Sequence, residues 1–173
     1  MKNQSILLAY ASRFGSTQEV AETIAATLRA AGHSVDIQAM QAVKTIGNYD
    51  AIVLGAAIYG GKWHPDAHQF LSQHQQTLKQ RSVAIFSLGP LSTGNAAKVR
   101  SRRQLDKELE KYPWLIPIAT EMFVGKYDPK KPGMGFFEKL MPASDHREWD
   151  VIRAWANALP SQLQNAELLL RPA

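Results

Sequence analysis

The sequence predicts an α/β fold: a doubly wound, five-stranded parallel sheet with helices on both faces. Two observations support this class. Apolar stretches without polar alternation, such as residues 5–11 and 82–89, are typical of strands buried on both faces. Segments with apolar residues at helical spacing follow these stretches in turn. Strands that alternate with helices indicate a parallel sheet covered on both sides.

Five strands are expected along the chain. They are "SILLAYA" at residues 5–11, "SVDIQAM" at 34–40, "YDAIVLGAAI" at 49–58, "SVAIFSLG" at 82–89 and "WLIPIATEMFVG" at 114–125. The second alternates enough to lie nearer an edge of the sheet. Pro113 and Pro117 lack backbone N–H groups, so part of the fifth strand is expected at an edge or a bulge.

Helices are expected between and after these strands. The first is predicted by Val20, Ile24 and Leu28 and ends at Gly32. Others are expected from Pro65 to about Lys79 and from 97 to 112. Asp145 has the sequence pattern of an N-cap, with a glutamate three residues later as in a capping box. The closing helix should place one set of residues on a single side: Trp149, Ile152, Trp155, Ala156 and Leu159.

Composition limits the class of protein. The 173 residues suit one domain, 1–173, and 45% apolar with 20% charged residues is typical of soluble globular chains. Apolar runs are far shorter than the roughly 20 residues of a membrane helix. Because the N-terminus lacks a signal-peptide pattern and the chain has no cysteine, we expect a cytoplasmic location and neither disulfides nor thiolate chemistry.

The chain is basic, with a formal net charge of +5 and a sequence pI near 9.5. Such a charge fits a nucleic acid, an anionic membrane surface or an acidic ligand. No nucleic-acid motif is present, so no nucleic-acid partner is expected. His64 and His68 share a helical spacing, but no third metal ligand accompanies them, and no metal site is expected.

The loop after the first strand has the composition of an anion cradle. Ser12, Ser16 and Thr17 supply hydroxyls, Gly15 allows a backbone turn, and a helix begins directly afterwards. A phosphate monoester fits such a loop. Neither a P-loop nor a dinucleotide glycine motif is present, so ATP and NAD are not favoured. The alternative is that Ser16 or Thr17 simply caps the helix.

Two further loops follow strands at the same edge of the sheet. "GAAIYGGKWHP" at 55–65 combines glycines with Tyr59 and Trp63, which suits stacking on a planar ring or packing on a neighbouring helix. "SLGPLSTGN" at 87–95 is again rich in glycine and hydroxyls. Together the three loops indicate a ligand with a phosphate at one end and a flat ring at the other.

Over nearly its whole length the chain resembles the flavodoxin family. The loop at 12–17 stands in the place of that family's S/T-x-T-G-x-T phosphate loop, with Phe14 at the middle hydroxyl. The resemblance implies non-covalent FMN and the strand order 2-1-3-4-5. Within the superfamily the chain looks most like the menaquinone-dependent protoporphyrinogen dehydrogenase branch, by Arg13, "GAAIYGGKWH" and "DHREW" at 145–149.

The same resemblance implies a cofactor-binding set with no side chain in a catalytic role. The phosphate is assigned to Ser12, Arg13, Phe14, Gly15, Ser16 and Thr17. The ring is assigned to Ala56, Ala57, Ile58, Tyr59, Gly60, Gly61, Trp63, Ser87, Leu88, Gly89, Pro90 and Leu91.

Three functions follow from these expectations. The first is an FMN-dependent oxidoreductase that passes reducing equivalents from an organic substrate, such as protoporphyrinogen, to a quinone. The second is an electron carrier that meets redox partner proteins. The third is a binding module without flavin, because Phe14 replaces a hydroxyl. The basic, apolar loop at 126–143 either touches an anionic membrane surface or folds its apolar residues onto the core.

Overall fold

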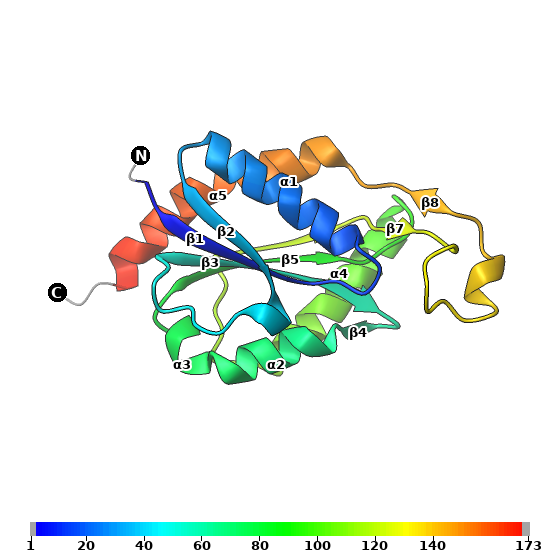
Figure 1. The fold of residues 1–173 in the computed structure, drawn as a ribbon, viewed down its shortest axis with the longest axis horizontal. Coiled ribbons are helices and arrows are strands. Elements are labelled where there is room, and N and C mark those ends of the chain that lie inside the picture. The colour runs from blue at the N-terminus through cyan, green and yellow to red at the C-terminus, as the bar shows by residue number, and fades with distance from the viewer. Residues whose placement is uncertain (1–2, 171–173) are drawn as a thin grey trace.

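The computed structural model describes residues 3–170. Its main sheet runs in the order β2-β1-β3-β5-β6, with every neighbouring pair parallel. The strands are β1 (Ser5–Ala11), β2 (Ser34–Ala39), β3 (Ala51–Tyr59), β5 (Ser82–Leu88) and β6 (Ala119–Phe123). This is the predicted order of five parallel strands (Figure 1). A two-residue strand, β4 (Lys62–Trp63), turns back antiparallel to β3 and was not predicted.

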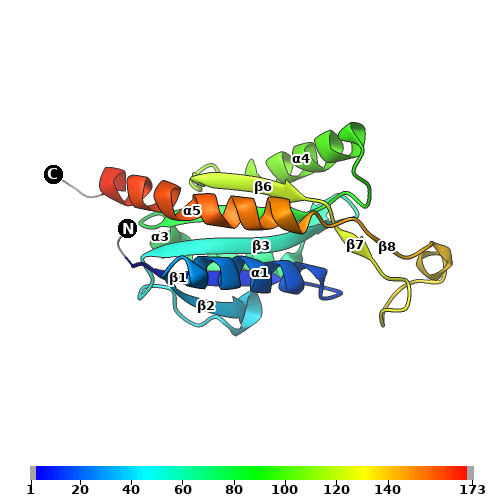
Figure 2. The same ribbon diagram turned by 90° about the horizontal axis from the view of Figure 1, so that it is seen from above.

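Helices cover both faces of the sheet, as Figure 2 shows from above. On one face α1 (Ser16–Ala30) and α5 (Trp149–Leu170) pack on one cluster of buried residues. The other face is covered by α2 (Pro65–Gln73), α3 (Gln75–Leu78) and α4 (Asn95–Leu109), over a second cluster. Each strand can serve both clusters because its successive side chains point to opposite faces.

The apolar stripes predicted for the first and last helices are confirmed. Val20, Ile24 and Leu28 of α1 are fully buried against the sheet. In α5, Ile152, Ala156 and Leu159 are fully buried, while Trp149 and Trp155 pack against them. Gly32 follows α1 with φ +90°. Glycine adopts this left-handed conformation, which commonly ends a helix, without steric strain because it has no Cβ.

Three sequence expectations are corrected in detail. The helix expected from Pro65 to Lys79 is interrupted at His74, which separates α2 from α3. The fifth strand is shorter than expected because the chain enters the sheet only at Ala119, after Pro117. Asp145 is not an N-cap: it lies in β8 (Ser144–Asp145), and its carboxylate accepts hydrogen bonds from Arg147.

The expected loop after β6 contains a small ribbon. In it β7 (Lys126–Tyr127) pairs antiparallel with β8, and η2 (Glu138–Leu140) lies between them. Another short helix, η1 (Met40–Ala42), follows β2. Figure 1 shows the β7–β8 ribbon and its loop extending past the carboxyl ends of the main strands. Among residues 3–170, no helix is long and apolar enough to cross a membrane.

Candidate cofactor site

A cleft of about 360 Å³ lies at the carboxyl ends of β1, β3 and β5. This is the edge where a doubly wound sheet binds its ligand. The three loops predicted from the sequence meet here. Of the predicted cofactor residues, the ones that line the cleft are Arg13, Phe14, Ser16, Thr17, Ala57, Ile58, Tyr59, Gly60, Gly61, Leu88, Gly89 and Leu91.

The remaining predicted residues lie around the cleft without lining it. Gly15 shapes the first loop: it adopts φ +88°, and its N–H donates to Oγ of Ser12 at 3.0 Å. Pro90 is a buried residue of the third loop, and its carbonyl accepts from the N–H of Gly125. Ala56, Trp63 and Ser87 lie in the core below the cleft.

The first turn of α1 faces the cleft without a capping side chain. Its N-cap is Gly15, and no side chain of the described residues caps it. Ser16 and Thr17 lie inside the helix, so the alternative in which either residue is the cap is wrong. A helix N-terminus with unpaired N–H groups carries a partial positive charge and attracts an anion.

Thr17 presents a buried hydroxyl at this helix end. The residue is 1% exposed, and its Oγ1 has no hydrogen-bond partner among the described residues. A buried hydroxyl without a partner costs free energy, so native structures leave few of them. An oxygen of a bound phosphate would supply the missing partner. The hydroxyl and the uncapped amides therefore fit the phosphate of FMN.

An aromatic group stands at the cleft in place of the middle hydroxyl of the loop. The rings of Phe14 and Tyr59 lie 5.9 Å apart between centroids. The guanidinium carbon of Arg13 lies 4.9 Å from the Phe14 ring and 4.7 Å from the Tyr59 ring. Arg13 is thus held by cation–π contacts, and the two rings offer flat apolar surface to a planar ligand.

Trp63 does not present its ring to the cleft as predicted. It is 2% exposed, and its Nε1 donates to the carbonyl of Ala56 at 3.2 Å and to Oγ of Ser87 at 3.0 Å. The physical reason is β4, which turns the chain back on β3 and directs the indole into the core. The structure thus leaves Tyr59 as the aromatic residue of this loop that lines the cleft.

The sequence did not reveal one wall of the cleft, which comes from the segment after β6. This wall contains Gly125, Lys126, Tyr127, Asp128, Lys131, Met134 and Met141, and His64 and Gln104 complete the lining. The lysines, glycines and prolines of this segment identified it as a loop. They form no periodic pattern from which its packing against the first loop could be predicted. Only the ribbon of β7 and β8 brings it there.

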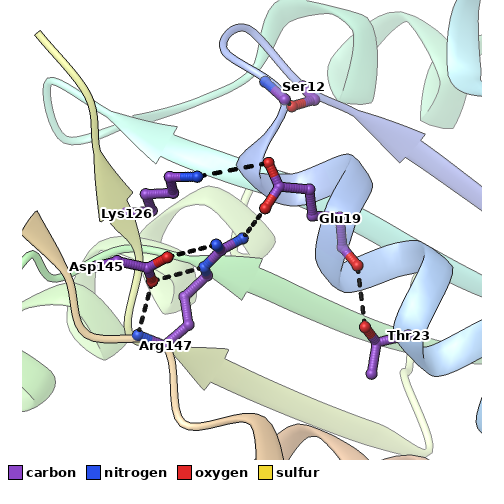
Figure 3. A network of polar contacts seen from close by, with 7 residues as sticks. Ser12, Glu19, Thr23, Lys126, Asp145 and Arg147 are labelled. Carbon is purple, nitrogen blue, oxygen red and sulfur yellow. Dashed lines mark hydrogen bonds and ion pairs between the residues drawn. The ribbon is translucent and has the colours of Figure 1, made fainter.

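A network of charges fixes the base of this ribbon to α1 (Figure 3). Nη1 of Arg147 lies 2.6 Å from Oε2 of Glu19, and its Nη2 lies 2.6 Å from Oδ2 of Asp145. Lys126 Nζ approaches Glu19 at 3.7 Å. The hydrogen bonds from Arg147 hold the pKa of Asp145 below its usual range, and those carboxylates raise the pKa of Arg147.

The apolar residues of the same loop divide into two groups. Met134 is buried, whereas Phe136, Phe137 and Leu140 are 74%, 81% and 69% exposed. Met141 is also exposed, and it lines the cleft. The alternative in which the loop folds its apolar residues onto the core is therefore wrong for most of them.

The two histidines at helical spacing have different positions: His64 is the N-cap of α2, and His68 lies inside the helix. In the part of the chain that the structure describes, no group of three potential ligands is found. His68 contacts the buried carboxylate of Glu108 at 2.9 Å and the hydroxyl of Tyr112 at 2.5 Å. These contacts join α2 to α4 and to the residues after it.

Comparison with known proteins agrees with this geometry. A family model described as a flavodoxin domain matches residues 7–143. Protoporphyrinogen IX dehydrogenase (quinone) of Escherichia coli strain K12 is 29% identical over 84 residues, which are 47% of this chain and 46% of that protein. The matched segment therefore spans about half the length of this curated relative.

Solved structures show the same fold. Oxidised flavodoxin 1 from Bacillus cereus aligns with a TM-score of 0.56 at 15% identity, over 93% of this chain and 97% of its own. A flavodoxin from the domain Archaea gives 0.58 at 14% identity, over 92% and 99%. Together with the family model, these matches show that the chain belongs to the flavodoxin family, whose cofactor, FMN, fits this cleft.

Proposed function

We propose that the chain is an FMN-dependent oxidoreductase that removes two electrons and two protons from an organic substrate and delivers them to a quinone, which leaves as a quinol. FMN supplies the electron or hydride transfer when bound. The protein contributes the phosphate site at the start of α1 and an apolar cleft that excludes water from the ring. None of its side chains is assigned as an acid or a base.

The observation that carries the choice of a quinone is the surface beside the cleft. Phe136, Phe137, Leu140 and Met141 form an exposed patch, which we call the apolar tip. Met141 belongs both to the tip and to the cleft lining, so apolar surface continues from solvent to the cofactor site. A quinone with an isoprenoid tail is apolar, and such a path is suited to its ring.

The apolar tip also suits a membrane surface. Lys130 and Lys139 are exposed on the same loop, and the chain carries a net positive charge. Exposed aromatic residues with flanking lysines bind anionic bilayers by combining apolar insertion with attraction to the headgroups. We therefore propose peripheral contact between the tip and an anionic bilayer, where a lipid-soluble quinone is concentrated.

The partial likeness to protoporphyrinogen IX dehydrogenase (quinone) supports the same reaction class and supplies a substrate pair to test. The FMN-loaded protein is mixed without oxygen with protoporphyrinogen IX and a water-soluble menaquinone analogue. Conversion of this substrate to porphyrin removes six electrons and six protons in three such two-electron steps, so three quinols should form per porphyrin. We expect both products to form at least about tenfold faster than with free FMN at equal concentration. A rate equal to that of free FMN would contradict the proposal.

An electron carrier for partner proteins is the second candidate, favoured by the whole-chain likeness to flavodoxins. Stepwise anaerobic reduction separates the two. An oxidoreductase that delivers electron pairs to a quinone should take up both electrons at nearly one potential. Uptake in two well-separated one-electron steps, with fast transfer to a redox protein and none to the quinone, would establish the carrier instead.

A further inference from the structure

We infer that Lys131, from the loop after β6, binds the phosphate of FMN across the cleft and makes the site selective for the phosphorylated flavin. The inference rests on the proposal that the cleft holds FMN with its phosphate at α1. It assigns to this chain a phosphate ligand outside the loop at 12–17.

The first step is the position of the lysine. Its Nζ lies 3.9 Å from the point where a Cβ on Gly15 would stand, which places the ammonium directly over the phosphate loop. Lys131 also lines the cleft together with Thr17 and Ser16. Helix N–H groups, a buried unpartnered hydroxyl and an ammonium thus converge on one place.

The second step is the charge of the lysine. Among the described residues no carboxylate forms an ion pair with Lys131, whereas Lys126 is directed to Glu19 and Arg13 lies over aromatic rings. Lys131 is also half-buried, so its ammonium is partly withdrawn from solvent. An anion in the cleft would compensate this charge.

The third step is how the loop holds the lysine there. Oδ1 of Asp128 accepts from the N–H of Lys130 at 3.0 Å, and its carbonyl accepts from the N–H of Lys131 at 3.2 Å. This turn follows directly after β7, whose partner strand is joined to α1 through Arg147 and Glu19. These backbone bonds and the Arg147–Glu19 ion pair hold the backbone of Lys131 beside the start of α1, from where its ammonium reaches the phosphate loop.

The fourth step is the composition of the first loop. Phe14 brings no hydroxyl to the anion, and its ring contacts Tyr59. The ammonium of Lys131 would take the place of the missing hydroxyl. Its hydrogen bond to a phosphate dianion is charge-assisted and therefore stronger than a bond from a neutral hydroxyl. The contact depends on the phosphate alone and adds nothing for riboflavin, which has the same ring without that group.

The experiment compares two flavins on three variants. Dissociation constants of FMN and riboflavin are measured by fluorescence quenching for the wild type, Lys131→Met, Lys131→Arg and Lys130→Met. For Lys131→Met we expect the FMN dissociation constant to rise about tenfold or more while that of riboflavin changes less than about twofold. Lys131→Arg should recover most of the loss, and Lys130→Met, which changes an exposed neighbour, should behave as wild type.

Salt gives an independent reading of the same contact. Raising the ionic strength should weaken FMN binding to the wild type more than to Lys131→Met, because screening acts on the removed charge pair. Unchanged FMN affinity in Lys131→Met, or equal losses for FMN and riboflavin, would overturn the inference while leaving the FMN site in place. A wild-type protein that binds neither flavin would instead overturn the proposed function itself.

Discussion

Arg147 and Glu19 meet at 2.6 Å and so connect the last loop of the chain to the first turn of α1. Arg147 is buried, and its other two guanidinium nitrogens, Nε and Nη2, donate to the carboxylate of Asp145. The contact matters for the site because the phosphate is assigned to the same turn of α1 and Lys131 to the same loop.

Replacing Arg147 by methionine should lower the free energy of unfolding by about 1–3 kcal/mol, because two neighbouring carboxylates lose charge-assisted hydrogen bonds. FMN affinity should fall as well, since the ribbon loses its attachment to α1. Urea unfolding and FMN titration measure the two effects. Lys98→Met is the matched control: it removes an exposed pair with Glu148 and should cost less than about 0.5 kcal/mol. Equal effects of the two variants would contradict the prediction.

The carboxyl group of Asp145 should make stability depend on acid pH. Its pKa in the folded chain is lowered from 3.8, chiefly by hydrogen bonds from Arg147. A lowered pKa means that the stabilisation is complete above the unfolded value of 3.8 and is lost as the pH falls through the folded value. The stability advantage of wild type over Asp145→Asn should therefore be full at about pH 6 and shrink below about pH 4.

Denaturant unfolding at several pH values measures this advantage. The Arg147→Met background serves as the control, because Asp145 has lost the donor that lowers its pKa there. In that background the pH dependence assigned to Asp145 should largely disappear. An advantage that stays constant from neutral to acid pH would show that Asp145 gains nothing from Arg147.

Thr17 should affect the free protein and the FMN complex in opposite directions. Thr17→Val keeps the shape but removes a buried hydroxyl without a partner, so the free protein should be as stable as wild type or slightly more so. FMN affinity should nevertheless fall about fivefold, since the phosphate loses one donor. Thr17→Glu should abolish FMN binding, because a carboxylate would stand in the phosphate position. Wild-type FMN affinity in both variants would place the phosphate elsewhere.

The fold was predictable because its signals are local and periodic. Apolar runs without polar alternation predicted the parallel strands. Apolar residues at helical spacing predicted α1 and the buried side of α5. The prediction that Asp145 is an N-cap was wrong because many short polar segments match an N-cap pattern. Here the carboxylate has a stronger partner in Arg147, which the spacing alone does not disclose.

The site was predictable where it depends on strand ends and not where it depends on side-chain direction. Strand ends place the loops of β1, β3 and β5 together, and the structure brings them to one cleft. Trp63 was expected at the ring because it follows a strand. The two-residue β4 reverses the chain and hides the indole. Lys131 was missed as a site residue because the β7–β8 ribbon, which pairs segments distant in the sequence, carries it to Gly15.

The apolar tip should be required for binding to anionic vesicles. Replacing Phe136 and Phe137 by serine removes the two most exposed aromatic rings of the tip and should reduce co-sedimentation with phosphatidylglycerol vesicles at least about tenfold. Ile116→Ser is the matched control, because Ile116 is also a highly exposed apolar residue but precedes β6, away from the tip. Its binding should equal that of wild type. Since the two phenylalanines do not line the cleft, FMN affinity should be unchanged in the double variant. Retained vesicle binding in that variant, or binding that is independent of anionic lipid, would refute the proposed contact with the bilayer.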